Sequence, residues 1–320
     1  LAARAHRLRC RAWDAFFPHP SSVTDDYWTF ASWRARQRVF TSMLTILSTQ
    51  AMLEAVGVGA KRSLPAAATL NWVLKDGLGK LGRISVATVF GRGFDSDLKA
   101  YRFRSSCLYS ACIFLEMLTP YFPDRFLPLA TAAMVGKSVG LTTFLATQPA
   151  INKSFSIGEN MAEISAKTQA QQVVMDNVGL ALVVLIRMAI RNNVPLNKAL
   201  PLLMFPALSL ADLYSISREL KSVELRTINL QRGELIAEQW IGSRTVPRQR
   251  EVGLQENLLL PPRISQGPHP LDLQPVTRIA ASPDELDRLM QIYKGEKYLM
   301  NVEPRPQGLL HDGGKIHVSL

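Results

Sequence analysis

Apolar residues recur at helical spacing along most of the first 245 residues of the chain. They fill long stretches at 39–58, 105–119 and 126–148 that carry few charged side chains. An apolar stripe that repeats every three or four residues is typical of a helix with one buried face. A run that is apolar all round is typical of a fully buried or membrane-embedded helix. The pattern therefore predicts a mainly α domain over residues 16–245.

Polar residues and prolines predict where these helices end. A basic cluster at 34–38 predicts a turn between one helix that begins near Thr24 and a second helix over 39–58. A polar stretch at 160–174 predicts a helix separate from the next one. The apolar run 178–186 in that next helix is shorter than the roughly 20 residues that span a membrane. Pro201 and Pro206 predict interruptions in the helix that follows.

The pattern changes after residue 245. Residues 246–281 are rich in Pro, Gln and Arg, a composition typical of a linker or an extended arm. Ser282, Pro283 and Glu285 then supply an N-cap, a first-turn proline and a capping-box glutamate for a short helix. Alternating residues on either side of a Gly-Gly turn predict a β-hairpin after it. Residues 282–320 are thus predicted to form a small α+β module, which we expect to be truncated.

Composition and charge narrow the expected partners. The chain has 47% hydrophobic and 20% charged residues and a formal net charge of +11, and residues 1–15 form a basic segment. A basic chain favours anionic partners. Because no nucleic-acid motif accompanies the charge, we expect membrane lipid rather than nucleic acid. The three cysteines and five histidines show no metal-ligand spacing, so no metal site is expected.

Two sets of small residues predict close packing between helices. They are Gly77, Gly79 and Gly82 in an alanine-rich run, and Ala132, Gly136 and Gly140 at four-residue spacing. Each glycine inside a helix costs roughly 1 kcal/mol against alanine, so another backbone is expected to approach closely. The first set also matches the dinucleotide-binding fingerprint. That fingerprint requires a preceding strand, however, whereas the residues before it have helical spacing.

The glycine-rich stretch also carries candidate ligand-binding residues, Lys75, Asp76 and Arg83. A desolvated Lys75 with a lowered pKa could form a Schiff base or hold a phosphate. The alternative is a structural ion pair between Asp76 and a cation one or two turns further on. Pyridoxal phosphate is the cofactor that the first interpretation admits, and the second needs none.

A second polar group consists of Asn160, Glu163 and Lys167. These residues could line a binding groove, or they could form a solvated helix surface on which Glu163 and Lys167 pair at i, i+4 spacing. No Ser/His/Asp set, paired carboxylate site or phosphate-binding loop is present. The sequence therefore predicts no catalytic residue.

Several blocks of residues occur in a fixed order along the chain. They are Ser22-Val23-Thr24 with Asp26-Tyr27, Leu47-Ser48-Thr49-Gln50, Trp72-Val73-Leu74-Lys75-Asp76-Gly77, Leu81-Gly82-Arg83, Phe94-Asp95, Lys99 with Arg102, Asn160 with Glu163, Ala166-Lys167, and Leu225, Thr227 and Asn229. In this order they resemble the ROOT UV-B SENSITIVE (RUS) family. The resemblance covers residues 16 to 240, and residues 282–320 resemble the family's C-terminal region.

The resemblance implies a plant protein associated with a membrane, in a plastid in some relatives, with a targeting region not visible here. It implies links to root development, UV-B response and vitamin B6 homeostasis. We therefore expect a non-enzymatic scaffold or carrier-like protein that contacts membrane lipid and associates with itself or another family member. The alternative is a binder of, or an enzyme acting on, a phosphorylated small molecule such as a B6 vitamer.

Overall fold

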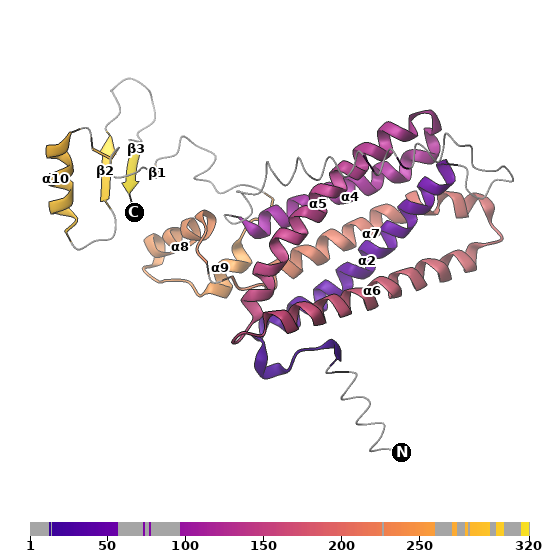
Figure 1. The fold of residues 1–320 in the computed structure, drawn as a ribbon, viewed down its shortest axis with the longest axis horizontal. Coiled ribbons are helices and arrows are strands. Elements are labelled where there is room, and N and C mark those ends of the chain that lie inside the picture. Colours follow the sequence, from indigo (N-terminus) through magenta and orange to yellow (C-terminus); the bar gives the residue numbers. More distant parts are fainter. Residues whose placement is uncertain are drawn as a thin grey trace, which may run out of the picture. The chain divides into compact units, whose positions relative to one another are not determined.

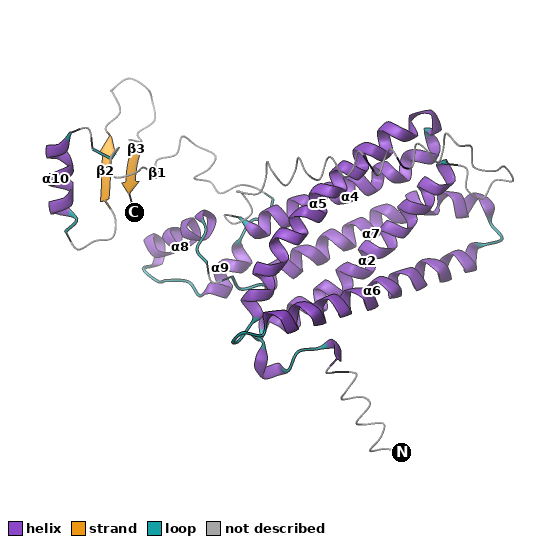
Figure 2. Ribbon diagram, in the orientation of Figure 1, coloured by secondary structure: helices purple, strands orange, loops and turns teal. Residues whose placement is uncertain are grey.

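The computed structural model describes residues 13, 15–56, 73, 77, 97–225, 227–259, 271–273, 279–280, 282–294, 299–303 and 315–319. These residues form two compact units that divide after Leu259. The first unit is helical, and the second combines one helix with short strands (Figures 1 and 2). The prediction of a mainly α protein is confirmed.

Long helices of the described residues form a bundle in the first unit. They are α2 (Asp26–Ala55), α4 (Leu98–Leu118), α5 (Phe126–Phe155), α6 (Met161–Ile190) and α7 (Val194–Ser222). The single turns η1 (Pro20–Ser22), η2 (Thr119–Tyr121) and η3 (Pro123–Arg125) connect or precede them, and the shorter α8 (Leu230–Ser243) and α9 (Gln249–Gln255) follow. In Figure 1, α2 runs beside α6 and α7, and α4 runs beside α5, in agreement with the contacts between these pairs.

Three predicted helix ends are wrong. The basic cluster at 34–38 lies inside α2, and the polar and apolar halves of 160–190 form one helix, α6. Pro201 and Pro206 lie inside α7 without ending it. The local signals for a break were outweighed by tertiary contacts, because α2 packs along α6 and α7 over most of its length.

Aromatic residues fill one end of the bundle. Tyr27 and Phe30 of α2 contact Phe155 of α5, with ring centroids 5.6 and 4.7 Å apart, and all three side chains are buried. Leu220 of α7 and Ile164 of α6 join the same cluster. The edge-on and tilted ring contacts add to the burial of apolar area and fix this end of four helices.

Small residues allow the helices to approach closely. A Cβ added to Gly136 of α5 would lie 2.2 Å from Cys112 Sγ of α4, and one added to Gly140 would lie 3.0 Å from Tyr109. A third approach, not predicted from the sequence, brings Gly179 of α6 against Ser42 of α2. The other predicted packing residues make no such contact or are not described. Ala132 is exposed, and a Cβ added to Gly77 would have no atom within 4 Å. Gly79 and Gly82 lie outside the described residues.

The outer surface of the bundle is apolar. Three helical segments are long and apolar enough to cross a membrane, Pro123–Phe155, Met161–Ile190 and Val194–Ser222. On α6 the exposed fractions of Val173, Leu185 and Met188 are 59%, 60% and 62%. Scattered exposed apolar side chains are normal in soluble proteins, but a continuous apolar helix face requires an apolar surrounding or a partner.

The second unit contains α10 (Pro283–Ile292) and a sheet of β1 (Leu271–Leu273), β2 (Leu299–Glu303) and β3 (Lys315–Ser319) in the order β1-β3-β2. Ser282 caps α10 as predicted, since its Oγ accepts from the N–H of Glu285 at 3.2 Å. β3 pairs antiparallel with β2 and parallel with β1. The connection between β2 and β3 lies outside the described residues, so the hairpin stays a prediction. The segment 246–281 contributes α9 to the first unit and β1 to the second.

Candidate binding sites in the helical bundle

A cavity of about 320 Å³ lies among the long helices of the bundle, and each of these helices contributes to its wall. Its polar lining includes Arg38 and Thr41 from α2, Arg102 from α4, Lys137 from α5, Gln172 from α6 and Asp212 from α7. We call this space the central cavity. Its volume lies within the range of small-molecule sites, about 300–1,000 Å³. The central cavity places three cations and one carboxylate in the middle of an apolar bundle.

A buried carboxylate pairs with Arg102 of the central cavity and with a second arginine, Arg34. Glu219 of α7 is fully buried, and its Oε1 lies 3.2 Å from Arg34 Nη1 and 3.7 Å from Arg102 Nη2. The side-chain oxygen of Gln148 accepts hydrogen bonds from both guanidinium groups, at 3.0 and 3.2 Å. The guanidinium of Arg102 also lies 4.2 Å from the centre of the Phe144 ring. Buried charges are tolerated when they are paired in this way.

The other charged residues of the central cavity differ in their partners. Lys137 Nζ lies 2.8 and 2.9 Å from the two carboxylate oxygens of Glu116, and Arg38 pairs with Asp176 at 2.7 Å. Asp212 instead accepts hydrogen bonds from Thr41 at 2.5 Å and Gln37 at 3.0 Å, and it makes no ion pair within the described part of the chain. The carboxylate partners Glu116 and Asp176 do not line the cavity, so three of the four charged residues in its wall are cationic.

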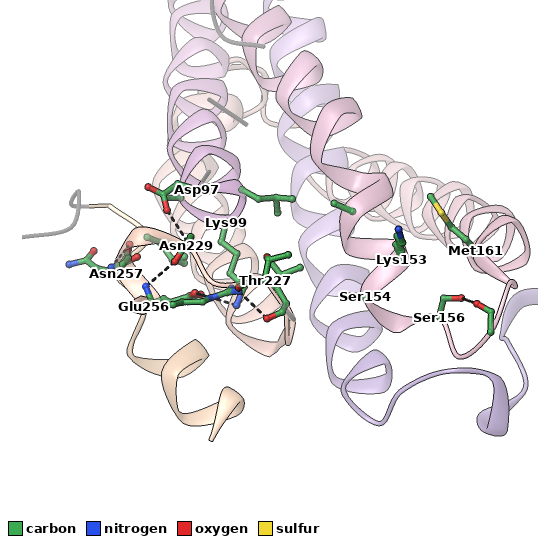
Figure 3. A pocket seen from close by; sticks show the side chains of 18 of the residues that line it. Asp97, Lys99, Lys153, Ser154, Ser156, Met161, Thr227, Asn229, Glu256 and Asn257 are labelled. Atoms are coloured by element: carbon green, nitrogen blue, oxygen red, sulfur yellow. Dashed lines mark hydrogen bonds and ion pairs between the residues drawn. The ribbon is translucent and has the colours of Figure 1, made fainter. Parts of the chain in front are cut away.

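A second, larger cavity of about 820 Å³ lies at the end of the bundle, between the start of α4, the end of α5 and the α8–α9 region (Figure 3). We call it the end pocket. Lys99 and Arg232 both pair with Glu256 there, Lys99 Nζ at 2.9 Å from the carboxylate. Arg232 also donates to the backbone carbonyls of Leu225 and Thr227 at 2.9 and 2.6 Å. These contacts tie the segment after α9 to the first turn of α4.

Burial shifts two titrating groups of the end pocket. It lowers the pKa of Lys99 against the opposing attraction of Glu256, because the charged amine loses its water. It raises the pKa of Asp97, which accepts a hydrogen bond from the Asn229 amide at 2.9 Å. Both shifts favour the neutral forms, so the end pocket is less strongly charged than its residue types indicate.

The predicted polar residues of α6 serve as anchors for other segments. Asn160 donates to the carbonyl of Ser22 at 2.7 Å and accepts from the hydroxyl of Ser156 at 2.5 Å. Lys167 contacts Glu163 at 2.5 Å and donates to the carbonyl of Phe17 at 3.1 Å. These residues line neither cavity. Lys75, Asp76 and Arg83, the other predicted ligand residues, lie outside the described residues.

Most charged residues of the central cavity were missed from the sequence. Lys99 and Arg102 lie one helical turn apart in one of the blocks that carry the family resemblance, yet Lys99 faces the end pocket and Arg102 the central cavity. The signal that could have found the others is a charge inside an otherwise apolar helix, such as Glu116, Lys137 or Asp212. No group of three or more His, Cys, Asp or Glu side chains in the described ranges is arranged to hold a metal ion.

Most of the chain matches a known protein family. A family model described as "Vitamin B6 photo-protection and homoeostasis domain" matches residues 2–244, which include the whole bundle. The chain belongs to the root UV-B sensitive family. This confirms the resemblance drawn from the ordered blocks of residues. No solved structure is significantly similar to it.

Root UV-B sensitive proteins of Arabidopsis thaliana are similar over most of the chain. Protein root UVB sensitive 4 is 39% identical over 304 residues, which cover 94% of the chain and 58% of that relative. Protein root UVB sensitive 6 is 32% identical over 94% of the chain and 61% of its own length. Protein root UVB sensitive 2, chloroplastic, is 29% identical over 89% of the chain and 65% of its length. The chain thus spans about three fifths of these relatives.

Proposed function

We propose that this root UV-B sensitive protein is a membrane-embedded, carrier-like protein that binds a small phosphorylated anion in its central cavity. The observation that carries the proposal is the combination of an apolar outer surface with ion pairs buried inside the bundle. Apolar side chains cover the outside of α5, α6 and α7, and paired arginines, a lysine and carboxylates lie among the apolar residues of the interior. Soluble helical bundles instead have polar outer faces and few buried charges.

The energetics of lipid favour this arrangement. A charged side chain in the middle of a bilayer costs about 3 kcal/mol or more, so such residues face the interior, pair with one another and mark substrate or ion pathways. Lys137 meets this condition, since Glu116 of the neighbouring helix neutralises it. Close contacts at Gly136 and Gly140 are typical of helices that pack in membranes.

The lining of the central cavity supports an anionic ligand with an aromatic ring. Arg38, Arg102 and Lys137 supply cations suited to a phosphate, and Tyr109 and Phe144 supply ring faces. The vitamin B6 homoeostasis named in the family model supports a phosphorylated B6 vitamer as this ligand. In this proposal the protein binds the ligand without transforming it and needs no cofactor.

The relatives' names support the physiological setting that we propose. The words "root UVB sensitive" support a role in root development and UV-B response, and the word "chloroplastic" in one relative's name supports a plastid membrane. Association with a second copy or with another family member, and a β-hairpin that joins β2 and β3 in the C-terminal module, are further parts of this proposal.

Two measurements test the proposed function. Alkaline carbonate extraction of membranes from cells that express the protein is expected to leave it in the pellet. Purified protein in detergent is then expected to bind pyridoxine 5′-phosphate in a calorimeter. Ser106→Leu should abolish binding because Ser106 lines the central cavity, outside the ion pairs. Ser32→Leu is the matched control, because both serines donate to a carbonyl of the preceding helical turn and Ser32 is exposed.

Release by carbonate would refute the membrane embedding. Absence of binding by the unaltered protein, or equal binding by the Ser106→Leu variant, would refute the central cavity as the ligand site.

A further inference from the structure

One face of α7 changes its chemistry along the helix. Exposed Leu196, Leu203 and Leu210 lie at seven-residue intervals, followed by Tyr214 four residues on and Arg218 after another four. Residues at these spacings share one face of a helix. Leu203, Leu210 and Tyr214 are 61%, 69% and 59% exposed. The face therefore runs from apolar to aromatic to cationic, ending toward the C-terminus of α7.

The length of this stripe matches a lipid bilayer. From Leu196 to Tyr214 the helix rises roughly 27 Å, at 1.5 Å per residue. The hydrocarbon core of a bilayer is about 30 Å thick, and aromatic side chains with polar tips gather at its borders. Tyr214 thus stands where the hydrocarbon ends, and Arg218 stands one turn further out, at the depth of the lipid headgroups.

A second arginine and a tryptophan from α2 complete a cluster at this level. The ring of Trp33 lies edge-on to Tyr214, with centroids 5.7 Å apart. The guanidinium groups of Arg36 and Arg218 lie 4.5 and 5.6 Å from the centre of the Trp33 ring. Both arginines are exposed, and neither makes an ion pair with any residue that the structure describes.

We propose that Trp33, Arg36, Tyr214 and Arg218 form a binding site for the headgroup of an anionic phospholipid. The inference rests on the proposed membrane embedding and adds a lipid specificity to it. Two guanidinium groups that contact the same ring can each donate hydrogen bonds to a phosphodiester. The apolar stripe below them accommodates the acyl chains, which a soluble phosphate compound lacks. The occupant is therefore a lipid rather than a free anion.

The opposite end of the bundle provides a matched control. Arg191 and Lys198 flank the connection between α6 and α7, and both are exposed. They make no aromatic contact or ion pair within the described residues. Removing these two charges changes the net charge of the protein by the same amount as removing Arg36 and Arg218, but it leaves the cluster around Trp33 intact. A general attraction between a basic protein and an acidic bilayer would respond equally to both pairs of substitutions.

The test uses the full chain in nanodiscs of phosphatidylcholine, alone or mixed with phosphatidylglycerol. The lipid retained after transfer to detergent is identified by mass spectrometry, and thermal unfolding is followed in both nanodiscs. The unaltered protein should retain phosphatidylglycerol above its share in the mixture and should melt at a higher temperature in the mixed nanodisc. The Arg36→Gln/Arg218→Gln variant should lose both effects, whereas the Arg191→Gln/Lys198→Gln variant should keep them.

Equal losses in the two double variants, or no enrichment in the unaltered protein, would overturn the proposal. Stabilisation by inorganic phosphate alone, equal to that by phosphatidylglycerol, would also overturn it, since the site would then not select a lipid. A protein that resists carbonate extraction but shows no enrichment loses only this inference. A protein that carbonate releases loses the proposed function itself.

Discussion

The buried carboxylate shared by two arginines gives the sharpest test of the bundle's interior. Glu219→Gln keeps the shape of the side chain but removes the negative charge that Arg34 and Arg102 share. Breaking a buried ion pair by removing one partner costs about 3–5 kcal/mol, because an uncompensated charge remains. Here two guanidinium groups would be left with neutral acceptors, Gln148 for both, Gln172 for Arg34 and Thr147 for Arg102. We therefore expect the free energy of unfolding to fall by about 3–5 kcal/mol.

The same substitution at the surface provides the control. Glu163 is 45% exposed and pairs with Lys167 at the i, i+4 spacing. Exposed pairs of this kind contribute about 0–1 kcal/mol, because water screens them. One kcal/mol shifts the melting temperature of a domain of 150–250 residues by roughly 2–4 °C. Glu219→Gln should thus lower it by roughly 6–20 °C in thermal unfolding, and Glu163→Gln by no more than roughly 4 °C.

Similar shifts in the two variants would show that the Arg34–Glu219–Arg102 contacts do not stabilise the bundle. A destabilisation below about 1 kcal/mol in Glu219→Gln would mean that water reaches these groups and screens them.

Two further predictions concern packing and pH. Gly179→Ala should lower the melting temperature by several degrees relative to Gly233→Ala. Both substitutions raise helix propensity, but only a Cβ at position 179 would clash with another helix, since it would lie 2.7 Å from Ser42 Cβ. Equal melting temperatures of the two variants would contradict the close contact. The raised pKa of Asp97 means that the native state keeps a proton that the unfolded state has lost, so stability should fall as pH rises above the ordinary value of 3.8. Asp97→Asn should lack this fall in melts recorded across the acid range, and a fall of the same size in the variant would refute it.

Much of the helical architecture could be predicted from the sequence, because its signals are local. The N-cap at Ser282 and the apolar runs of α4 and α5 depend only on neighbouring residues. The arginines at 34–38 predict a turn because they interrupt the apolar pattern. In the structure α2 continues through them, and Arg34 is paired with Glu219, a partner 185 residues away in the chain. Periodicity and capping carry no information about such distant partners.

In the candidate sites, too, single residues could be predicted from local signals, but their arrangement in space could not. Lys137 could be recognised as a charge that other segments must cover, and Glu116 as the exception in its own apolar run. The central cavity could not be predicted, because it requires helices that are distant in the sequence to place their polar faces together. The glycine-rich stretch, which drew most of the sequence-based hypotheses, falls almost wholly outside the described residues, and its chemistry stays a prediction.

The separation of α2 from its ionic partners has a consequence for biosynthesis. Arg34 and Arg38 are among the first residues of the bundle to be synthesised, but Asp176 and Glu219 follow them by 138 and 185 residues. While the ribosome is still making α6 and α7, the first helix carries cations without counterions. In the proposed membrane-embedded state, these unpaired cations would make entry of α2 into lipid less favourable before α6 and α7 are made. The counterions on the last helices would thus favour insertion of α2 together with them.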